Sequence, residues 1–346
     1  MIDGLARVRT YHGDVSSLLN SLRGGRGLSR YAACVLGFMV VVILEGAVVR
    51  ATGSGAGCGN HWPLCNGEVI PHHPRIATMI EFAHRSLTGI LVTMVVGLIA
   101  WVFVSRERGT RMRRAAVWVG VLLVTEALLG AVLVKGAYVE KNASDMRVFV
   151  QCVHFTNTML LVAALALTWW WAREVVEAPK LSPIKTQGLK PLGTAPSYGT
   201  AEAVPLRGQR AVAWLAVVAT IVVGATGSVA ALADTLFPAP SLRAGLMEDF
   251  SAAAPLLVRM RWVHPAAALV GVVCVAWLCV RVRGTAARWL GWLMAAQLML
   301  GVGDVLLLAP TWMQVLHLLG ADLYWIALVV VCAEIVRLDK KAYPSG

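Results

Sequence analysis

Four histidines occupy equivalent places in four long apolar stretches of this sequence. His84, His154, His264 and His317 each lie near the start of such a stretch. Ionisable side chains are costly in hydrocarbon, so each is a candidate functional residue. A lone histidine is more often a hydrogen-bonded packing residue, but four at one depth indicate ligands. Two imidazoles on facing helices can bind a metal ion or clamp a haem between them.

A single carboxylate accompanies these histidines. Glu81 precedes His84 by three residues, so the two side chains share one face of a helix. A zinc site usually recruits further Cys, Asp or Glu ligands, whereas each half of this chain offers two histidines and many apolar residues. That pattern favours a flat apolar cofactor over a bare ion. The residue three before His264 is Arg261, so Glu81 has no counterpart in the second half.

The elements that carry these residues are predicted to be transmembrane helices. The chain has 346 residues, of which 58% are hydrophobic and 14% charged, and its mean hydropathy is +0.69. Soluble domains carry about 25% charged residues, and a span needs about 20 apolar residues. We therefore expect an all-α integral membrane protein with eight transmembrane helices. The predicted spans are approximately 31–50, 82–104, 115–134, 150–172, 211–232, 262–280, 286–308 and 314–336.

Basic residues predict the orientation. The formal net charge is +12, and eight spans place most of the Lys and Arg on one side, which the positive-inside rule makes the cytoplasm. We therefore expect a multi-pass protein of the bacterial cytoplasmic membrane with both termini in the cytoplasm. We expect the protein to contact membrane lipid and no nucleic acid, and the sequence leaves its oligomeric state open. The basic segments are the N-terminal arm, 105–114, 173–210, 281–288 and the tail after 336.

Residues 173–210 divide the chain into two halves. Five prolines mixed with Lys, Ser and Gly predict a flexible cytoplasmic linker there. Residues 1–172 and 211–346 would then form two pseudo-symmetric four-helix bundles with corresponding sites. The repeat rests on short matches: Thr52-Gly53-Ser54 with Thr226-Gly227-Ser228, and Leu129-Gly130-Ala131 with Leu300-Gly301-Val302.

The first predicted outer loop carries a cysteine pair. Cys58 and Cys65 would face an oxidising compartment, where a disulfide is stable. The pair is either redox-active beside the site or a structural staple of the loop, and the sequence leaves both open.

Several arginines lie on the predicted outer side, against the positive-inside trend. Arginine pairs well with carboxylates, and a haem carries two propionates. These arginines are candidate propionate anchors, and the alternative is that they extend to the membrane interface. The candidates are Arg50, Arg85, Arg147 and Arg261.

Four stretches resemble the haem A synthase family, and the resemblance extends over essentially the whole chain. They are Val49–Gly55, the Gly-Cys…Trp-Pro-Leu-Cys loop 57–65, Glu81–Arg85 and His317–Leu323. That family oxidises a methyl group of haem O to a formyl group, which gives haem A for terminal oxidases. The resemblance implies an oxidoreductase with haem O as substrate and water as the oxygen source. It also suggests haem O synthase and oxidase assembly factors as partners.

The resemblance further implies how the residues divide between the halves. His84 and His154 would ligate the substrate haem in the catalytic first half, with Glu81 as the essential acid. His264 and His317 would be the axial ligands of a haem b cofactor in the second half.

One departure from the family pattern concerns the cysteines. Cys58 and Cys65 match the pair of many members, but residues 233–261 lack the second pair that some members carry. A mechanism that needs thiols in both halves is therefore not expected. Glu45, Glu126 and Asp304 lie in predicted helices without an assigned role.

Three other function classes compete with this interpretation. A non-catalytic dihaem b-type electron carrier explains four histidines equally well, but it explains neither Glu81 nor the cysteine loop. A haem-binding or transport protein is a second alternative. A prenyltransferase that makes haem O is the third, and the sequence shows no Asp-rich diphosphate-binding motif for it. Pigment extraction separates these classes, because only the enzyme yields haem A.

Overall fold

The computed structural model describes residues 25–177, 206–282 and 284–342 of the chain. Most of the predicted linker and of the basic N-terminal arm lies outside these residues. Within them the fold is all-α, with one isolated β-bridge between Cys65 and Glu68. The predicted fold class is confirmed.

All eight predicted spans are present as long helices, and each is long and apolar enough to cross a membrane. Most begin or end a few residues beyond the prediction, because polar residues at both ends continue the helical hydrogen bonding. The helices are α2 (Gly25–Ala51), α3 (Ile76–Ser105), α4 (Arg111–Lys135), α5 (Asp145–Glu177), α6 (Leu206–Leu236), α9 (Val263–Arg281), α10 (Thr285–Leu306) and α11 (Thr311–Ala342).

Two short helices between α6 and α9 were not predicted. They are α7 (Leu242–Asp249) and α8 (Leu256–Arg259). Ser241 caps α7, since its side chain accepts a hydrogen bond from the backbone N–H of Ala244. Both helices are too short to show an apolar run of membrane length.

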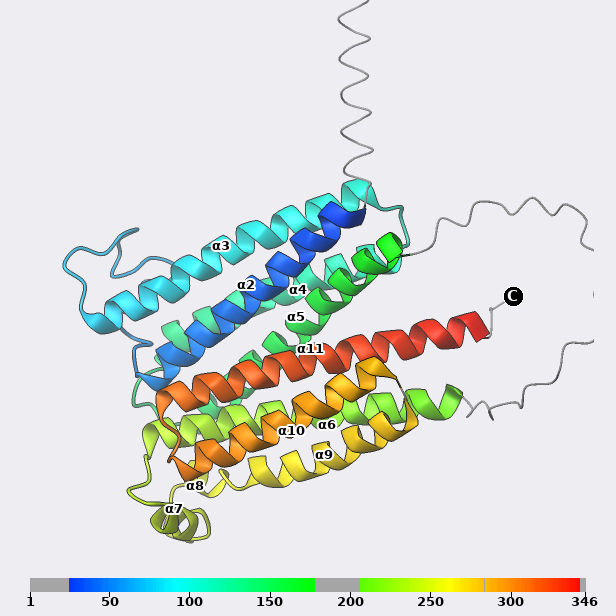
Figure 1. Cartoon of the computed structure of the whole chain (residues 1–346). Coiled ribbons are helices and arrows are strands. Elements are labelled where there is room, and N and C mark those ends of the chain that lie inside the picture. Colours follow the sequence, from blue (N-terminus) through cyan, green and yellow to red (C-terminus); the bar gives the residue numbers. More distant parts are fainter. Residues whose placement is uncertain (1–24, 178–205, 283, 343–346) are drawn as a thin grey trace, which may run out of the picture.

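The eight long helices form two closed cycles of neighbours. In the first, α2 and α4 each contact α3 and α5; in the second, α6 and α10 each contact α9 and α11. The cycles meet where α5 and α2 pack against α6 and α11. Figure 1 shows the two groups side by side with their helices running along a common direction. Trp325 of α11 donates a hydrogen bond from Nε1 to the carbonyl of Met159 in α5 (2.8 Å), which links the two groups.

The up-and-down order brings all four histidines to one end of the protein. At this histidine end α3, α5, α9 and α11 begin, and α2, α4, α6 and α10 finish. The loop 52–75 and the helices α7 and α8 lie there too (Figure 1). The opposite end, here called the arginine end, carries the loop 106–110.

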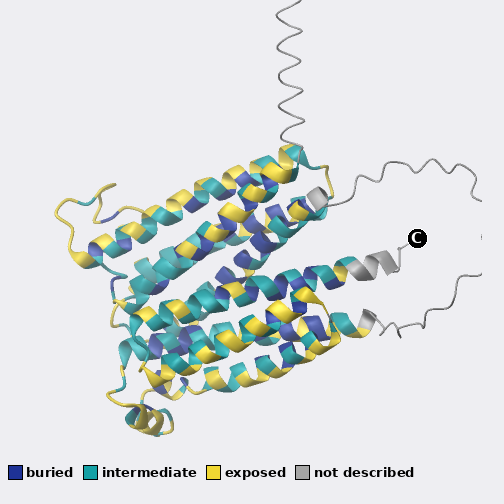
Figure 2. Cartoon of the chain, viewed as in Figure 1, coloured by how far each residue is buried: buried dark blue, intermediate teal, exposed yellow. Residues whose placement is uncertain are grey.

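The outward faces of the helices suit a lipid environment. Exposed residues alternate with buried ones along each helix, and the buried ones face neighbouring helices (Figure 2). Tryptophan prefers the boundary between lipid and water. Near the arginine end, exposed tryptophans occur on four helices: Trp118, Trp214, Trp277, Trp289 and Trp292. The chain is thus a multi-pass membrane protein with eight candidate spans.

Candidate functional site

The histidines of the second half form a pair across the bundle. The ring centroids of His264 and His317 are 6.3 Å apart, and the rings stand at 81°. An imidazole nitrogen binds a metal at about 2 Å, so two rings sharing one ion from opposite sides have centroids roughly 6 Å apart. Nδ1 of His264 lies 3.1 Å from the carbonyl of Val223. A hydrogen bond from Nδ1 leaves Nε2 as the free ligand atom.

The histidines of the first half, His84 and His154, lie near each other. Nδ1 of His154 is 3.5 Å from Oε1 of Glu126 in α4. Nδ1 of His84 is buried without a hydrogen-bond partner, while Nδ1 of His154 has the Glu126 carboxylate as its neighbour. An orphaned buried ring nitrogen such as that of His84 is unusual in a finished core and fits a site built for a further group.

Glycines make room for three of the four rings. A Cβ on Gly46 would lie 3.1 Å from Cε1 of His84. A Cβ on Gly227 would lie 2.9 Å from Cε1 of His264, and one on Gly301 would lie 3.0 Å from Cε1 of His317. Each glycine belongs to the long helix that precedes the one carrying its histidine. The rings therefore lie in recesses that any larger residue would fill.

The positions of these glycines change one of the matches on which the predicted repeat rests. The match of Thr52-Gly53-Ser54 with Thr226-Gly227-Ser228 is wrong, because the counterpart of Gly227 is Gly46. Gly53 has φ +66 and ends α2 in a Schellman motif, in which the N–H of Ser54 bonds to the carbonyl of Val49. Gly227, in contrast, lies inside α6, which continues to Leu236.

The described residues hold no group of three or more His, Cys, Asp or Glu side chains arranged around a metal ion. The histidines come together two by two. Two rings with apolar surroundings are the donor set of a haem, whose ring nitrogens supply the remaining ligands. The residues therefore fit haem in both halves.

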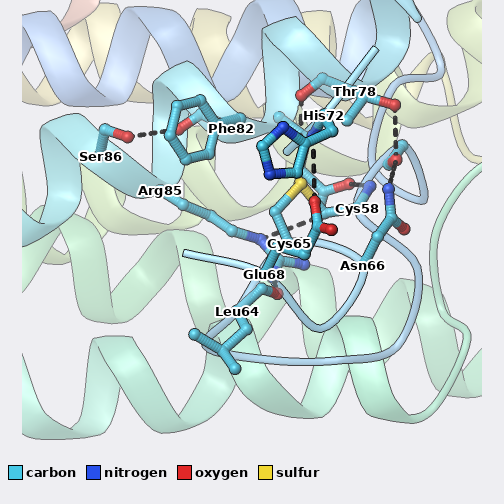
Figure 3. The surroundings of a disulfide bond; sticks show 12 residues. Cys58, Leu64, Cys65, Asn66, Glu68, His72, Thr78, Phe82, Arg85 and Ser86 are labelled. Atoms are coloured by element: carbon cyan, nitrogen blue, oxygen red, sulfur yellow. Dashed lines mark hydrogen bonds and ion pairs between the residues drawn. A yellow bond between two sulfur atoms is a disulfide. The ribbon is translucent and has the colours of Figure 1, made fainter. Parts of the chain in front are cut away.

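Glu81 has different neighbours from those the sequence suggested. Its side chain is buried, and Oε2 accepts a hydrogen bond from the backbone N–H of Cys58 at 2.7 Å. Oε1 accepts from Arg85 Nε at 3.1 Å and from Nη2 at 2.5 Å. Arg85 also donates to the carbonyl of Leu64 (Figure 3). Glu81 and Arg85 thus hold the loop 52–75 against the start of α3.

The cysteines of that loop form a disulfide. Cys58 and Cys65 are joined, with both residues buried. Figure 3 shows the bond beside Arg85, with Asn66 and Thr78 close by. Thr78 donates a hydrogen bond to the carbonyl of Gly57 at 2.8 Å. The disulfide belongs to the same assembly that surrounds Glu81.

The four candidate propionate anchors all have protein partners at the histidine end. Arg50 joins α2 to α6 and α11 through Thr235 (2.7 Å) and Gln314 (2.8 Å). Arg261, in the turn between α8 and α9, pairs with Asp249 of α7 at 2.8 Å and with Asp234 of α6 at 3.2 Å, which ties α6 and α7 to that turn.

Arg147 and Arg85 brace loops in the same way. Arg147 Nη1 donates to the carbonyls of Glu140 and Asn142, both at 2.6 Å. Among the four candidates, Arg147 has a buried Nε without a partner. It therefore retains a donor for a further acceptor, while the carboxylates around Arg261 disfavour an added anion.

Two residues beside the histidines were missed by the sequence reasoning. Glu126 lies next to His154, so Glu81 is not the single acid near the rings. Gln297 lies next to His317, with its Nε2 3.1 Å from Nδ1. Each stands four residues before a glycine, Gly130 or Gly301, and this shared spacing was the available signal.

Comparison with known proteins identifies the family. The profile of the COX15-CtaA family, described as "Cytochrome oxidase assembly protein", matches residues 29–329. The chain belongs to this family. The predicted resemblance to haem A synthases is confirmed, and members of the family typically bind haem.

Individual relatives fall into two groups. A protein of Thermus thermophilus named "Protoheme IX farnesyltransferase" is 39% identical over 330 residues, which cover 92% of this chain and 50% of that protein. Proteins named "Heme A synthase" match shorter stretches. That of Exiguobacterium sibiricum is 34% identical over 142 residues (41% of this chain, 45% of that protein), and that of Alkalihalophilus pseudofirmus 35% over 148 (42% and 47%). The chain spans about half the length of the curated relatives it matches.

Proposed function

We propose that this protein is a haem A synthase, which oxidises the methyl group of haem O to the formyl group of haem A. The observation that carries the proposal is the pairing of the four histidines, with 6.3 Å between the ring centroids of His264 and His317. The family match supports it. Each half then holds one haem between two rings.

The two halves have different tasks in this proposal. His84 and His154 hold the substrate in residues 1–172, and His264 and His317 hold haem b in residues 211–346, across the linker 173–210. Haem b, when bound, supplies a site for electrons that leave the substrate. Arg147 has a free donor suited to a propionate. The histidine end faces away from the cytoplasm, and both termini face the cytoplasm.

Glu81 is the proposed catalytic carboxylate. Turning a methyl group into an aldehyde removes electrons and protons and adds an oxygen atom, which we assign to water. A buried carboxylate one helical turn from His84 can accept a proton from water or stabilise positive charge that develops nearby. Arg85 and the N–H of Cys58 fix its orientation. The same contacts give Glu81 a structural task in the loop, so the test must separate the two.

The matched variant for this test is Glu81→Gln. Glutamine keeps the volume and an acceptor for the Cys58 N–H, and it removes the charge. We expect haem A yield in cells supplied with haem O to fall by roughly 10²–10⁴-fold, as for other acid–base groups. Haem O or a hydroxylated product accumulates, while both haems stay bound. Glu68→Gln, in an exposed part of the same loop, is the control.

The outcome is read from extracted pigments, with limited proteolysis as a check on the loop. Wild-type haem A yield from Glu81→Gln would refute the catalytic assignment. Haem b alone from the wild-type protein would instead establish the electron-carrier alternative.

The Thermus relative bears on the supply of substrate. Its name describes a farnesyltransferase, and this chain matches half of its length. We propose that haem O synthase is a partner of this protein and delivers haem O to it; oxidase assembly factors would receive haem A. Conversion of haem b to haem O by the purified chain itself would show the prenyltransferase activity instead.

A further inference from the structure

The two halves place different side chains beside equivalent histidines. In α4 the sequence Glu126–Gly130 reads EALLG, and in α10 Gln297–Gly301 reads QLMLG. In the structure both leading residues reach the histidine of the following helix. Oε1 of Glu126 is 3.5 Å from Nδ1 of His154, and Nε2 of Gln297 is 3.1 Å from Nδ1 and 3.4 Å from Nε2 of His317. One ring therefore faces a carboxylate and the other a neutral amide.

The carboxylate of Glu126 is fixed in place by α5. Asn157 donates a hydrogen bond from Nδ2 to Oε2 at 2.6 Å, and the Thr158 hydroxyl donates to Oε1. Asn157 is held in turn, since its Oδ1 accepts from Thr125 at 2.7 Å. Both donors lie about one turn after His154 on the same helix. Every contact leaves Glu126 as the acceptor, and a carboxylate has lone pairs left for the ring N–H.

The second half excludes this arrangement and accommodates the amide. The position three after His317 is Gly320, where the first half has Asn157. A Cβ on Gly320 would lie 2.3 Å from Oε1 of Gln297, so glycine gives the amide its space. Gln297 also donates to the backbone carbonyl of His317 at 3.0 Å. The second half thus differs from the first at two corresponding positions: Gln297 stands in place of Glu126, and Gly320 stands in place of Asn157.

We propose that Glu126 and Gln297 are positioning residues that give the two haem sites different reduction potentials. This inference rests on the proposed function, because it takes His154 and His317 as iron ligands. A carboxylate that accepts the Nδ1–H of a ligand histidine makes the ring a stronger electron donor, which favours ferric over ferrous iron. The amide of Gln297, whose Nε2 donates to the His317 carbonyl, is neutral and offers the ring no such negative charge. The first-half site then has the lower potential, and electrons leaving the substrate move toward the second half.

The test exchanges the two side chains in the full-length protein purified with its haems. Glu126→Gln raises the midpoint potential of the first-half haem, and Gln297→Glu lowers that of the second. Outer-shell partners of this kind change metal affinity by about tenfold or more. A tenfold change in the ferric-to-ferrous ratio is about 59 mV for one electron. Redox titration followed by visible spectroscopy measures it, and the signal lost in His154→Ala assigns the first-half haem.

Glu334→Gln is the control for a carboxylate lost at a distance. It lies 17 residues after His317 on α11, where Glu334 pairs with Arg337, and its potentials match the wild type. The inference is overturned if the first-half potential of Glu126→Gln stays within the change seen in this control. If Glu126→Gln does not retain its haem, Gln297→Glu decides, and an unchanged second-half potential overturns the inference. Wild-type protein that binds no haem would overturn the proposed function as well.

Discussion

The recess under His264 predicts a large effect from one methyl group. In Gly227→Ala the new Cβ would stand 2.9 Å from Cε1 and 3.1 Å from Nδ1 of His264. Carbon atoms pack at about 3.5–4.0 Å, so the ring or α6 must move by roughly 0.6 Å. Overpacking typically costs about 1–3 kcal/mol, and replacing glycine by alanine in a helix returns roughly 1 kcal/mol. The free energy of unfolding therefore falls by at most about 2 kcal/mol, and the protein folds.

The substitution acts on the proposed haem b site. A cost of 1.4 kcal/mol on the ligating position of the ring weakens binding about tenfold. Titration of the purified protein with haem b measures this, with the haem-to-protein ratio read from absorbance. Gly291→Ala in α10 is the matched control, since a Cβ there meets nothing within 4 Å. The reasoning is refuted if Gly227→Ala binds haem b as tightly as Gly291→Ala does.

Two further predictions concern the loops at the histidine end. Arg261→Gln leaves the carboxylates of Asp234 and Asp249 without their partner, and breaking these partly buried pairs costs about 1–3 kcal/mol. Hydrogen exchange should rise in α7, and unchanged exchange there would contradict the tether. The double change Cys58→Ser and Cys65→Ser removes a short closed loop that contributes about 2 kcal/mol. If the disulfide is a staple, haem A yield persists at low temperature in this variant, whereas complete loss with an intact fold would establish the redox-active alternative.

At the histidine end, each half uses one charged side chain to hold a neighbouring segment, and the two charges have opposite signs. In the first half the acid Glu81 binds the backbone of the loop 52–75, and in the second the base Arg261 binds Asp249 of α7. Both residues stand three before a histidine. Each therefore holds a segment at the histidine end close to the start of a helix that carries a histidine. The first half adds a second carboxylate, Glu126, beside His154, where the second half has the neutral Gln297 beside His317.

The sequence by itself determined the eight helices and the four histidines. Membrane spans follow from the local concentration of apolar residues, which no tertiary contact alters. The alternating direction of the helices then places the starts of α3, α5, α9 and α11 at one end, so the common depth of the histidines was predictable. The cysteine pair was also visible. The division into two halves stays a prediction: residues 173–177 and 206–210 of the predicted linker belong to α5 and α6, and the rest lies outside the described residues.

Tertiary structure decided which side chains meet. The choice between Gly46 and Gly53 as the partner of a histidine depends on the axial position of α2 against α3, and the sequence repeat suggested the wrong one. Likewise, Glu126 looked like an isolated acid until α4 and α5 were packed together. A hydrogen bond between helices requires a match in rotation and height within about an ångström. Hydrophobic patterns specify which face is buried, but they do not fix that match.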